Sequence, residues 1–272
     1  MNVFISRSAF TSFQGRLGAV GLCAAALILP AFGSETSNPL PSHSIVPDGR
    51  KSPSTPSYRD HFSGKTVTDK DMAWDLVGHR KGNAPRVGEM APPFTLQTAD
   101  GDRKVSLEEL RRTKPVVLIF SSWGCDIFRE TLAGLQSLQT EYGDRAHFVM
   151  VYTREAHPTD GFGGVLGRVE DPKTNEERAA VARKARLQLR LPFLVLVDSI
   201  EDPVTTRWAG WPVRAFVVDT DGKVAYAGAQ GPWGFRPYRG FQHGNGKLVG
   251  LDGEFSRETL EEFLEKRFAK HP

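Results

Sequence analysis

The chain has 272 residues, of which 25% are charged and 39% are hydrophobic. These values are typical of a soluble globular protein with enough length to bury a core. The formal net charge is only +3 and no cluster of lysine and arginine is present, which excludes a nucleic-acid-binding class on charge. The histidines show no metal-ligand spacing and the cysteines number 2, so we expect no metal site.

Residues 1–33 predict a signal peptide. Arg7 and Arg16 form a positive flank before an apolar run at 17–32. The tripeptide Ala-Phe-Gly at 31–33 precedes Ser34. The run is shorter than the roughly 20 residues of a membrane span, so a cleaved signal is favoured over a retained anchor. We expect an exported protein, periplasmic or extracellular, with anchoring by this segment as the alternative. Cleavage removes Cys23 and leaves Cys125 as the single thiol.

Residues 34–86 predict a disordered polar linker. Apolar periodicity is weak there, and serines and charges are interspersed with prolines. The prolines are Pro39, Pro41, Pro47, Pro53, Pro56 and Pro85. We therefore expect one folded domain, residues 87–272, behind a tether.

Regular patterns begin at residue 87. Continuous apolar runs indicate strands buried on both faces, and apolar residues three and four apart indicate helices. In chain order they first predict two strands about an Asp-Gly turn in 94–107, a short helix at 106–112, a buried strand at 115–120 and a helix through 128–142. A buried strand at 146–153, a helix at 174–189 and a third buried strand at 193–199 follow. The pattern ends with a hairpin at 214–228 and a last helix at 256–270.

This order of elements predicts an α/β thioredoxin-like fold, in which helices flank a central mixed β-sheet. In that fold a proline, usually cis, closes the site just before the hairpin. Pro212 stands at that place, so we expect a cis peptide bond there.

Cys125 follows the first buried strand and precedes a predicted helix. Thioredoxin-like chains usually carry Cys-x-x-Cys at this point, but Phe128 occupies the second position. The unpaired N–H groups of a helix start favour a thiolate, so we expect a lowered pKa and a nucleophilic Cys125. A buried, inert cysteine is the alternative interpretation.

Polar side chains follow the next strand in the segment "VYTREAHPTDGF" at 151–162. Adjacent parallel strands end at one edge of a sheet, so Tyr152, Glu155 and His157 are predicted to face Cys125.

These motifs resemble the iodothyronine deiodinase family, in its bacterial, cysteine-containing branch. "FSSWGCDIF" at 120–128 matches the family's active-site element, with Cys125 at the selenocysteine position and Ser122 at the motif's serine. The 151–162 segment is similar to the family's Tyr-x-x-Glu-Ala-His-x-x-Asp-Gly-Trp stretch, and "AGAQGPWGF" at 227–235 to its Gly-x-x-Gly-Pro stretch. The resemblance implies a thioredoxin-like oxidoreductase.

Several positions depart from the family's pattern. Asp126 and Ile127 replace two prolines, and Trp123 replaces a cysteine of animal members. Thr174, Val213 and Gln230 stand where animal members carry substrate-contacting residues. We therefore expect weak or no activity on thyroid hormone, and some activity on a smaller halogenated phenol or a peroxide.

The resemblance implies reductive dehalogenation by a single nucleophilic cysteine, regenerated by an external thiol or a thioredoxin-like reductase, with no cofactor. Cys125 is the expected nucleophile, and His157, supported by Glu155 and Tyr152, manages the proton. The expected partners are a halogenated aromatic or peroxide substrate, a thiol reductant and a second copy in a homodimer. The predicted substrate-binding residues are Ser122, Gly124, Pro212, Arg214 and Trp233.

Two alternatives are open. A peroxiredoxin-like thiol peroxidase is suggested by Ser122, three residues before Cys125, although Leu118 stands where peroxiredoxins carry a proline. A non-catalytic thioredoxin-fold binding module is the other, and the reactivity of Cys125 distinguishes it from an enzyme.

Overall fold

The structure is a computed structural model that describes residues 58–59, 66–67, 84–161, 167–231, 234–241 and 255–269. The chain divides into two compact units, residues 1–50 and 51–272, and every described residue belongs to the second. The predicted signal peptide, most of the predicted linker and Trp233 lie outside the described residues. Export and the domain boundaries therefore stay predictions.

A pair of short strands lies in the segment predicted as a linker. The strands β1 (Tyr58–Arg59) and β2 (Thr66–Val67) are antiparallel, with Tyr58 opposite Val67. The polar composition of this segment did not indicate strands.

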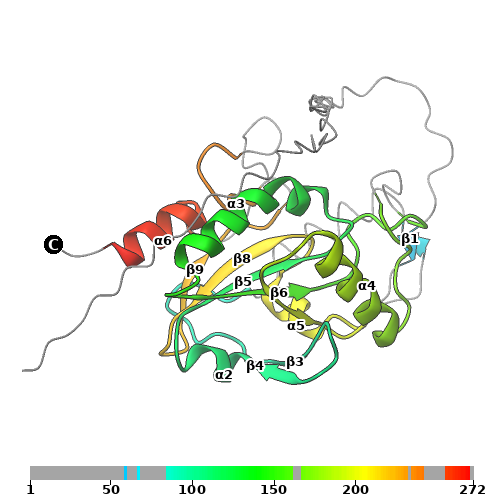
Figure 1. Ribbon diagram of the computed structural model, residues 1–272, viewed down its shortest axis with the longest axis horizontal. Coiled ribbons are helices and arrows are strands. Elements are labelled where there is room, and N and C mark those ends of the chain that lie inside the picture. Colours follow the sequence, from blue (N-terminus) through cyan, green and yellow to red (C-terminus); the bar gives the residue numbers. More distant parts are fainter. Residues whose placement is uncertain are drawn as a thin grey trace, which may run out of the picture. The chain divides into compact units, whose positions relative to one another are not determined.

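A seven-stranded mixed sheet forms the centre of the domain, in the order β4-β3-β7-β6-β5-β8-β9 (Figure 1). The strands β5, β6 and β7 are parallel to one another, and the remaining pairs are antiparallel. The bounds are β3 Thr95–Thr98, β4 Lys104–Ser106, β5 Val116–Ser121, β6 His147–Tyr152, β7 Leu194–Val197, β8 Arg214–Val218 and β9 Val224–Ala227. Every predicted strand is confirmed.

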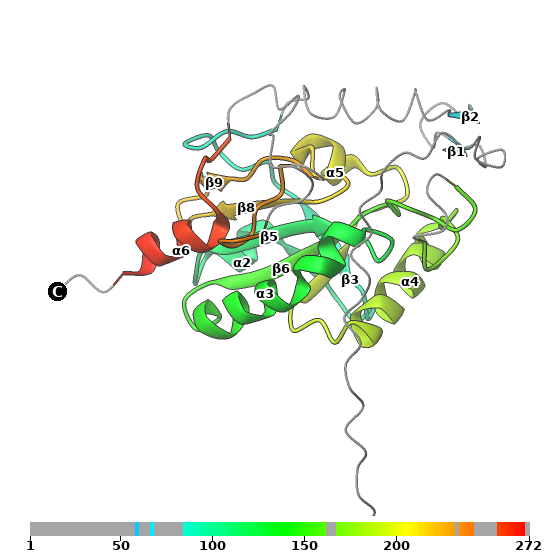
Figure 2. The same cartoon turned by 90° about the horizontal axis from the view of Figure 1, so that it is seen from above.

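The helices cover both faces of this sheet, as Figure 2 shows for α3 and α4 on one side and α5 on the other. The side chains agree, because α3, α4 and α6 contribute to one hydrophobic core, while α2 and α5 contribute to a second. The bounds are α2 Leu107–Arg111, α3 Asp126–Tyr142, α4 Asn175–Gln188, α5 Pro203–Trp208 and α6 Leu260–Phe268. These layers confirm the thioredoxin-like fold.

The two cores explain why β5 is apolar along its whole length. Alternate side chains of a strand point to opposite faces. Val117 and Ile119 accordingly lie in the core under α3 and α4, while Leu118 and Phe120 lie in the core under α2 and α5.

Helix starts follow local capping chemistry. The Thr174 side chain accepts a hydrogen bond from the N–H of Glu177 at 3.2 Å, and Thr259 with Glu262 forms a complete capping box. Such caps stabilise a helix by roughly 1 kcal/mol. The predicted helix starts near these residues are confirmed.

The outer edge of β9 is occupied by two other segments of the chain. The N–H of Gly88 donates to the Val224 carbonyl at 2.8 Å, and the N–H of Val224 donates to the Glu89 carbonyl at 2.9 Å. At the other end of the strand, the N–H of Ser256 donates to the Ala227 carbonyl at 2.7 Å. Both ends of this edge strand are therefore hydrogen-bonded on their outer side.

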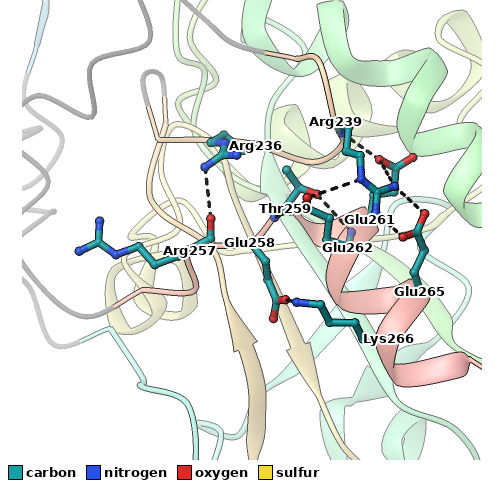
Figure 3. A network of polar contacts seen from close by, with 9 residues as sticks. All are labelled: Arg236, Arg239, Arg257, Glu258, Thr259, Glu261, Glu262, Glu265 and Lys266. Carbon is teal, nitrogen blue, oxygen red and sulfur yellow. Dashed lines mark hydrogen bonds and ion pairs between the residues drawn. The ribbon is translucent and has the colours of Figure 1, made fainter.

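After β9, residues 234–241 run beside α3 and are fastened to α6. Gly134 of α3 lies so close to the Tyr238 ring that a Cβ atom would overlap it. Figure 3 shows Arg239 among three carboxylates of α6, with its Nη1 3.4 Å from Glu261 and its Nε 3.5 Å from Glu262. The third carboxylate, that of Glu265, accepts from the same guanidinium at 2.6 Å. This contact network ties the segment after the hairpin to the last helix.

No helix among the described residues is long and apolar enough to cross a membrane.

Candidate active site

Cys125 lies where β5 ends and α3 begins. It is the N-cap residue of α3, its side chain caps no backbone N–H, and it is only 1% exposed. The backbone of Phe128 and the side chain of Ser121 lie close enough to its sulfur to favour the thiolate. The predicted position at a helix start is therefore confirmed.

The predicted lowering of the Cys125 pKa is wrong for this structure. Burial raises the pKa of the thiol to about 12, because a thiolate would lose its hydration. The polar groups of Phe128 and Ser121 lower the pKa by less than burial raises it, and the nearby Asp126 carboxylate adds to the rise. Cys125 is a protonated thiol in this structure, so attack on a substrate requires that water or a base reach it.

Tyr152 and Glu155 hold the loop in front of Cys125 through its backbone. One Glu155 oxygen accepts from the N–H of Gly124 at 2.5 Å, and the other accepts from the Tyr152 hydroxyl. The Tyr152 oxygen in turn accepts from the N–H of Trp123 at 3.0 Å. Both side chains are fully buried. Their observed contacts are with this loop, so they position the residue that precedes the thiol.

Burial also raises the pKa of Glu155, to about 7. The hydrogen bonds from Tyr152 and Gly124 favour the carboxylate and oppose this rise, but they do not cancel the cost of desolvation. Glu155 therefore changes its charge near neutral pH, in direct contact with the active-site loop.

Ser122 and Gly124 pack against the segment at 155–157. The Ser122 hydroxyl oxygen accepts from the N–H of Ala156 at 3.1 Å and is fully buried. A Cβ atom at Gly124 would lie 2.7 Å from a Glu155 oxygen and 3.1 Å from the His157 carbonyl. Both residues join the loops that follow β5 and β6, and their predicted role as substrate contacts stays a prediction.

His157 lies nearest to solvent among the predicted catalytic residues, with 20% of its side chain exposed. Its Nε2 is 3.7 Å from an oxygen of Asp126, the residue that follows Cys125. The structure thus brings His157 to the start of α3, as predicted, with Asp126 beside it.

The cis-proline closes the site from β8. The Trp211–Pro212 peptide bond is cis, which confirms the prediction. The hydroxyl of Ser121, the last residue of β5, donates to the Pro212 carbonyl at 3.3 Å. Pro212 therefore lies beside the end of the strand that leads to Cys125.

Arg214 does not join this site. Its Nε donates to the Gly228 carbonyl at 2.7 Å, and its guanidinium lies 4.8 Å from the centre of the Phe216 ring. Phe216 belongs to the core on the opposite face of the sheet from Cys125. The strand turns the Arg214 side chain to the other face of the sheet, and its contact with substrate stays a prediction.

Sequence reasoning missed Ser121 and Arg129. Nη1 of Arg129 donates to the Trp123 carbonyl at 2.7 Å, across the loop that carries Cys125. The signal was available, because a residue four positions after an N-cap lies one turn along the helix on the same side. Among the described residues, no group of three histidine, cysteine, aspartate or glutamate side chains could hold a metal ion.

Comparison with known proteins gives a consistent result. The family model of iodothyronine deiodinase matches residues 41–240. A type I iodothyronine deiodinase of Xenopus laevis is 28% identical over 153 residues, 56% of this chain and 60% of the relative. A thyroxine 5-deiodinase of Sparus aurata is 30% identical over 155 residues, 55% of this chain and 57% of the relative. The chain thus matches less than two thirds of the length of these relatives.

A solved thioredoxin domain of a thiol-disulfide oxidoreductase from Bacteroides vulgatus has a TM-score of 0.40 and 19% identity, and the match covers 54% of this chain and 91% of that one.

Proposed function

This chain belongs to the iodothyronine deiodinase family, and from that premise we propose that it is an exported, thiol-dependent reductive dehalogenase with Cys125 as its nucleophile. The observation that carries the proposal is the place of Cys125. It lies at the start of α3, after the strand whose last residue, Ser121, bonds to the cis-proline, and next to the loop that Tyr152 and Glu155 hold.

The proposed reaction begins with attack of the Cys125 thiolate on the halogen of an aryl halide. The carbon–halogen bond breaks, a sulfur–halogen bond forms, and the aryl carbon takes a proton, which we assign to His157. One external thiol then displaces halide from the sulfur to give a mixed disulfide. A second thiol releases Cys125, so two thiols and one aryl halide yield one disulfide, one arene and the hydrogen halide.

The external thiol is part of the proposal because the described residues contain one cysteine, Cys125. A second thiol at position 128 would resolve the oxidised sulfur internally, but Phe128 is there. A small thiol or a thioredoxin-like reductase supplies the electrons instead.

The test is turnover of 2-iodophenol, thyroxine and hydrogen peroxide with dithiothreitol. Cys125→Ser is expected to abolish all turnover, because serine is a poor nucleophile without a dedicated base. His157→Asn is expected to slow dehalogenation by about 10²–10⁴-fold, the usual contribution of general acid–base catalysis. A mixed disulfide at Cys125, detected by mass spectrometry, supports the cycle. Turnover that survives Cys125→Ser contradicts it.

The peroxide arm of this assay tests a thiol-peroxidase function. The same thiolate would then attack a peroxide oxygen to give a sulfenic acid and water or alcohol. Turnover of hydrogen peroxide, with no turnover of either iodinated compound, would assign that function.

A non-catalytic binding module is the second candidate, and the burial of Cys125 favours it. The two candidates differ in the chemistry of the thiol. Formation of the mixed disulfide only when an aryl halide is present supports the enzyme, and a thiol that stays unmodified supports the module.

Export is the remaining component, and it rests on residues 1–33. Intact-mass analysis of the protein from its native host is expected to show a chain that begins near Ser34. A mass that includes residues 1–33 would instead support anchoring by that segment.

A further inference from the structure

A buried ion pair joins the two layers of helices at the edge of the sheet where Cys125 lies. Arg178 belongs to α4, which covers one face, and Asp202 is the N-cap residue of α5, which covers the other (Figure 2). Their side chains are 0% and 2% exposed, and Nη1 of Arg178 donates to Oδ1 of Asp202 at 2.5 Å. The same Nη1 donates to the Ser199 carbonyl at 2.6 Å. Removing two charges from water is costly, so a buried pair adds less to stability than its contacts suggest.

Asp202 forms this pair instead of capping its own helix. An aspartate at an N-cap usually accepts a hydrogen bond from a backbone N–H of the first turn, but the Asp202 side chain makes no such bond. The Asp198 carboxylate takes its place, since it accepts from the N–H of Thr205 at 2.7 Å and from that of Val204 at 3.4 Å. Asp202 also has a left-handed backbone, with a φ of 52°, which residues other than glycine rarely adopt. The fold therefore holds Asp202 in an uncommon conformation and supplies a second aspartate as the cap.

The ion pair is tied to the loop after β6, which continues into Glu155. The Thr153 hydroxyl donates to Oδ1 of Asp202 at 3.4 Å, so the loop is bonded to the pair shortly before Glu155. Burial raises the pKa of Glu155, and the positive charge of Arg178 is near enough to oppose that rise. The pair therefore supports the loop that positions the residue before Cys125.

The ion pair is tied in the other direction to the cis-proline turn. The helix α5 begins after Asp202, and only Ala209 and Gly210 separate its last residue from Trp211, the first residue of the cis peptide bond. The loop and the turn also contact each other, because the Arg154 guanidinium lies 4.4 Å from the centre of the Trp211 ring. Both of these side chains are buried. Two of the segments that surround the thiol are thus anchored at one buried carboxylate.

We propose that Arg178 and Asp202 are a positioning pair, which fixes the loop after β6 and the cis-proline turn relative to each other and to Cys125. The inference rests on the proposed dehalogenation, in which the substrate lies between Cys125 and the proton donor, His157. Neither member of the pair is exposed to substrate, so its effect reaches the reaction through the placement of the groups that are. An error of about 1 Å in such a placement can slow a reaction by about 10²-fold.

The main test is the double variant Arg178→Met with Asp202→Asn. It removes both charges together, so no buried charge is left unpaired, and asparagine tolerates a left-handed backbone. We expect kcat for 2-iodophenol to fall by about 10²-fold while KM stays close to that of the wild type, because the pair acts on the reacting geometry and not on substrate binding. Arg178→Lys keeps a positive charge beside Asp202 and is expected to retain part of this kcat.

A matched control lies near the other end of α4. Arg186 forms an ion pair with Asp100, of the turn between β3 and β4, at 2.9 Å. The double variant Arg186→Met with Asp100→Asn is expected to leave kcat unchanged. An equal loss of kcat in this control overturns the proposal, and so does a wild-type kcat in the Arg178→Met, Asp202→Asn variant.

A second variant keeps the test decisive if that double variant does not fold. Thr153→Val removes only the hydroxyl that bonds to Asp202, and it is expected to lower kcat by a smaller factor, again with little change in KM. A wild-type kcat in Thr153→Val, together with a double variant that does not fold, assigns the pair to stability and overturns the proposal.

Hydrogen exchange tests the pair without any turnover. In the Arg178→Met, Asp202→Asn variant the amides of 153–157 and 203–212 are expected to exchange faster, while those of β5 and α3 keep their protection, because local openings expose only the segments that share a lost contact. Equal acceleration in all of these elements, or none in the two segments, overturns the proposal. A wild-type protein that turns over no aryl halide contradicts the proposed function, whereas local acceleration in the variant would still support the positioning pair.

Discussion

The Glu155 carboxylate holds the active-site loop by its backbone, since it accepts the N–H of Gly124 at 2.5 Å. The contact is independent of the side chains that surround the thiol. It connects the end of β6 to the residue before Cys125, so the protonation state of Glu155 acts on the position of the nucleophile.

Stability is expected to fall as pH rises from about 5 to about 8. Burial raises the pKa of Glu155 from 4.5 to about 7, so the folded protein holds a proton that the unfolded chain has lost. The stabilisation is complete below the unfolded pKa and is lost as pH passes the folded one, about 3 kcal/mol in total. Urea unfolding at pH 5 and pH 8 measures it. Glu155→Gln is expected to remove this pH dependence, and an equal dependence in the variant would assign it to another group.

Gly124→Ala is expected to destabilise the protein and to slow Cys125 chemistry. The new Cβ would meet a Glu155 oxygen at 2.7 Å and the His157 carbonyl at 3.1 Å, and such overpacking costs about 1–3 kcal/mol. Thermal unfolding and turnover check the two effects. Gly88→Ala is the comparison, because Gly88 has open space around it and a positive φ of 90°. It is expected to cost about 1 kcal/mol and leave turnover unchanged. Wild-type turnover in Gly124→Ala would show that the loop position does not matter.

Alkylation of Cys125 without substrate is expected to stay slow up to alkaline pH. The burial that raises the pKa of the thiol to about 12 places its titration far above the value of a free cysteine. Rates of iodoacetamide reaction from pH 6 to pH 11 are expected to keep rising without reaching a plateau. A midpoint below about 8.5 would mean that the helix start dominates over burial in solution.

Arg239→Ala is expected to loosen residues 234–241 from α6. Arg239 contacts Glu261, Glu262 and Glu265, all from that helix. The melting temperature is expected to fall at low salt and to approach that of the wild type as sodium chloride is added, because exposed ion pairs are screened. Arg103→Ala, which removes an exposed pair with Glu109, is the control. A salt-independent difference would assign the effect to packing.

The sequence predicted the strands and long helices well because their apolar periodicity follows from burial on one or both faces. The helix α5 was not predicted, because this helix has 6 residues, begins at Pro203 and follows Asp202, whose φ is positive. A helix of fewer than two turns shows no periodicity to read.

The site was predicted less completely, for two physical reasons. The motif located Arg214 beside the cis-proline, but only the register of β8 decides that its side chain points to the opposite face. The helix start at Cys125 was equally clear, whereas the burial that governs its pKa comes from residues distant in the sequence. Contacts of the kind made by Glu155 with the N–H of Gly124 leave no sequence pattern at all.

The covered edge of β9 bears on association between molecules. An open edge strand is a template on which another polypeptide can extend the sheet, the first step of many aggregates. Gly88, Glu89 and Ser256 already bond to the outer side of β9 at both ends. Another chain could add a strand there only by displacing these residues. Any pairing of two copies through β9 would therefore begin with local unfolding of the segments that contain Gly88, Glu89 and Ser256.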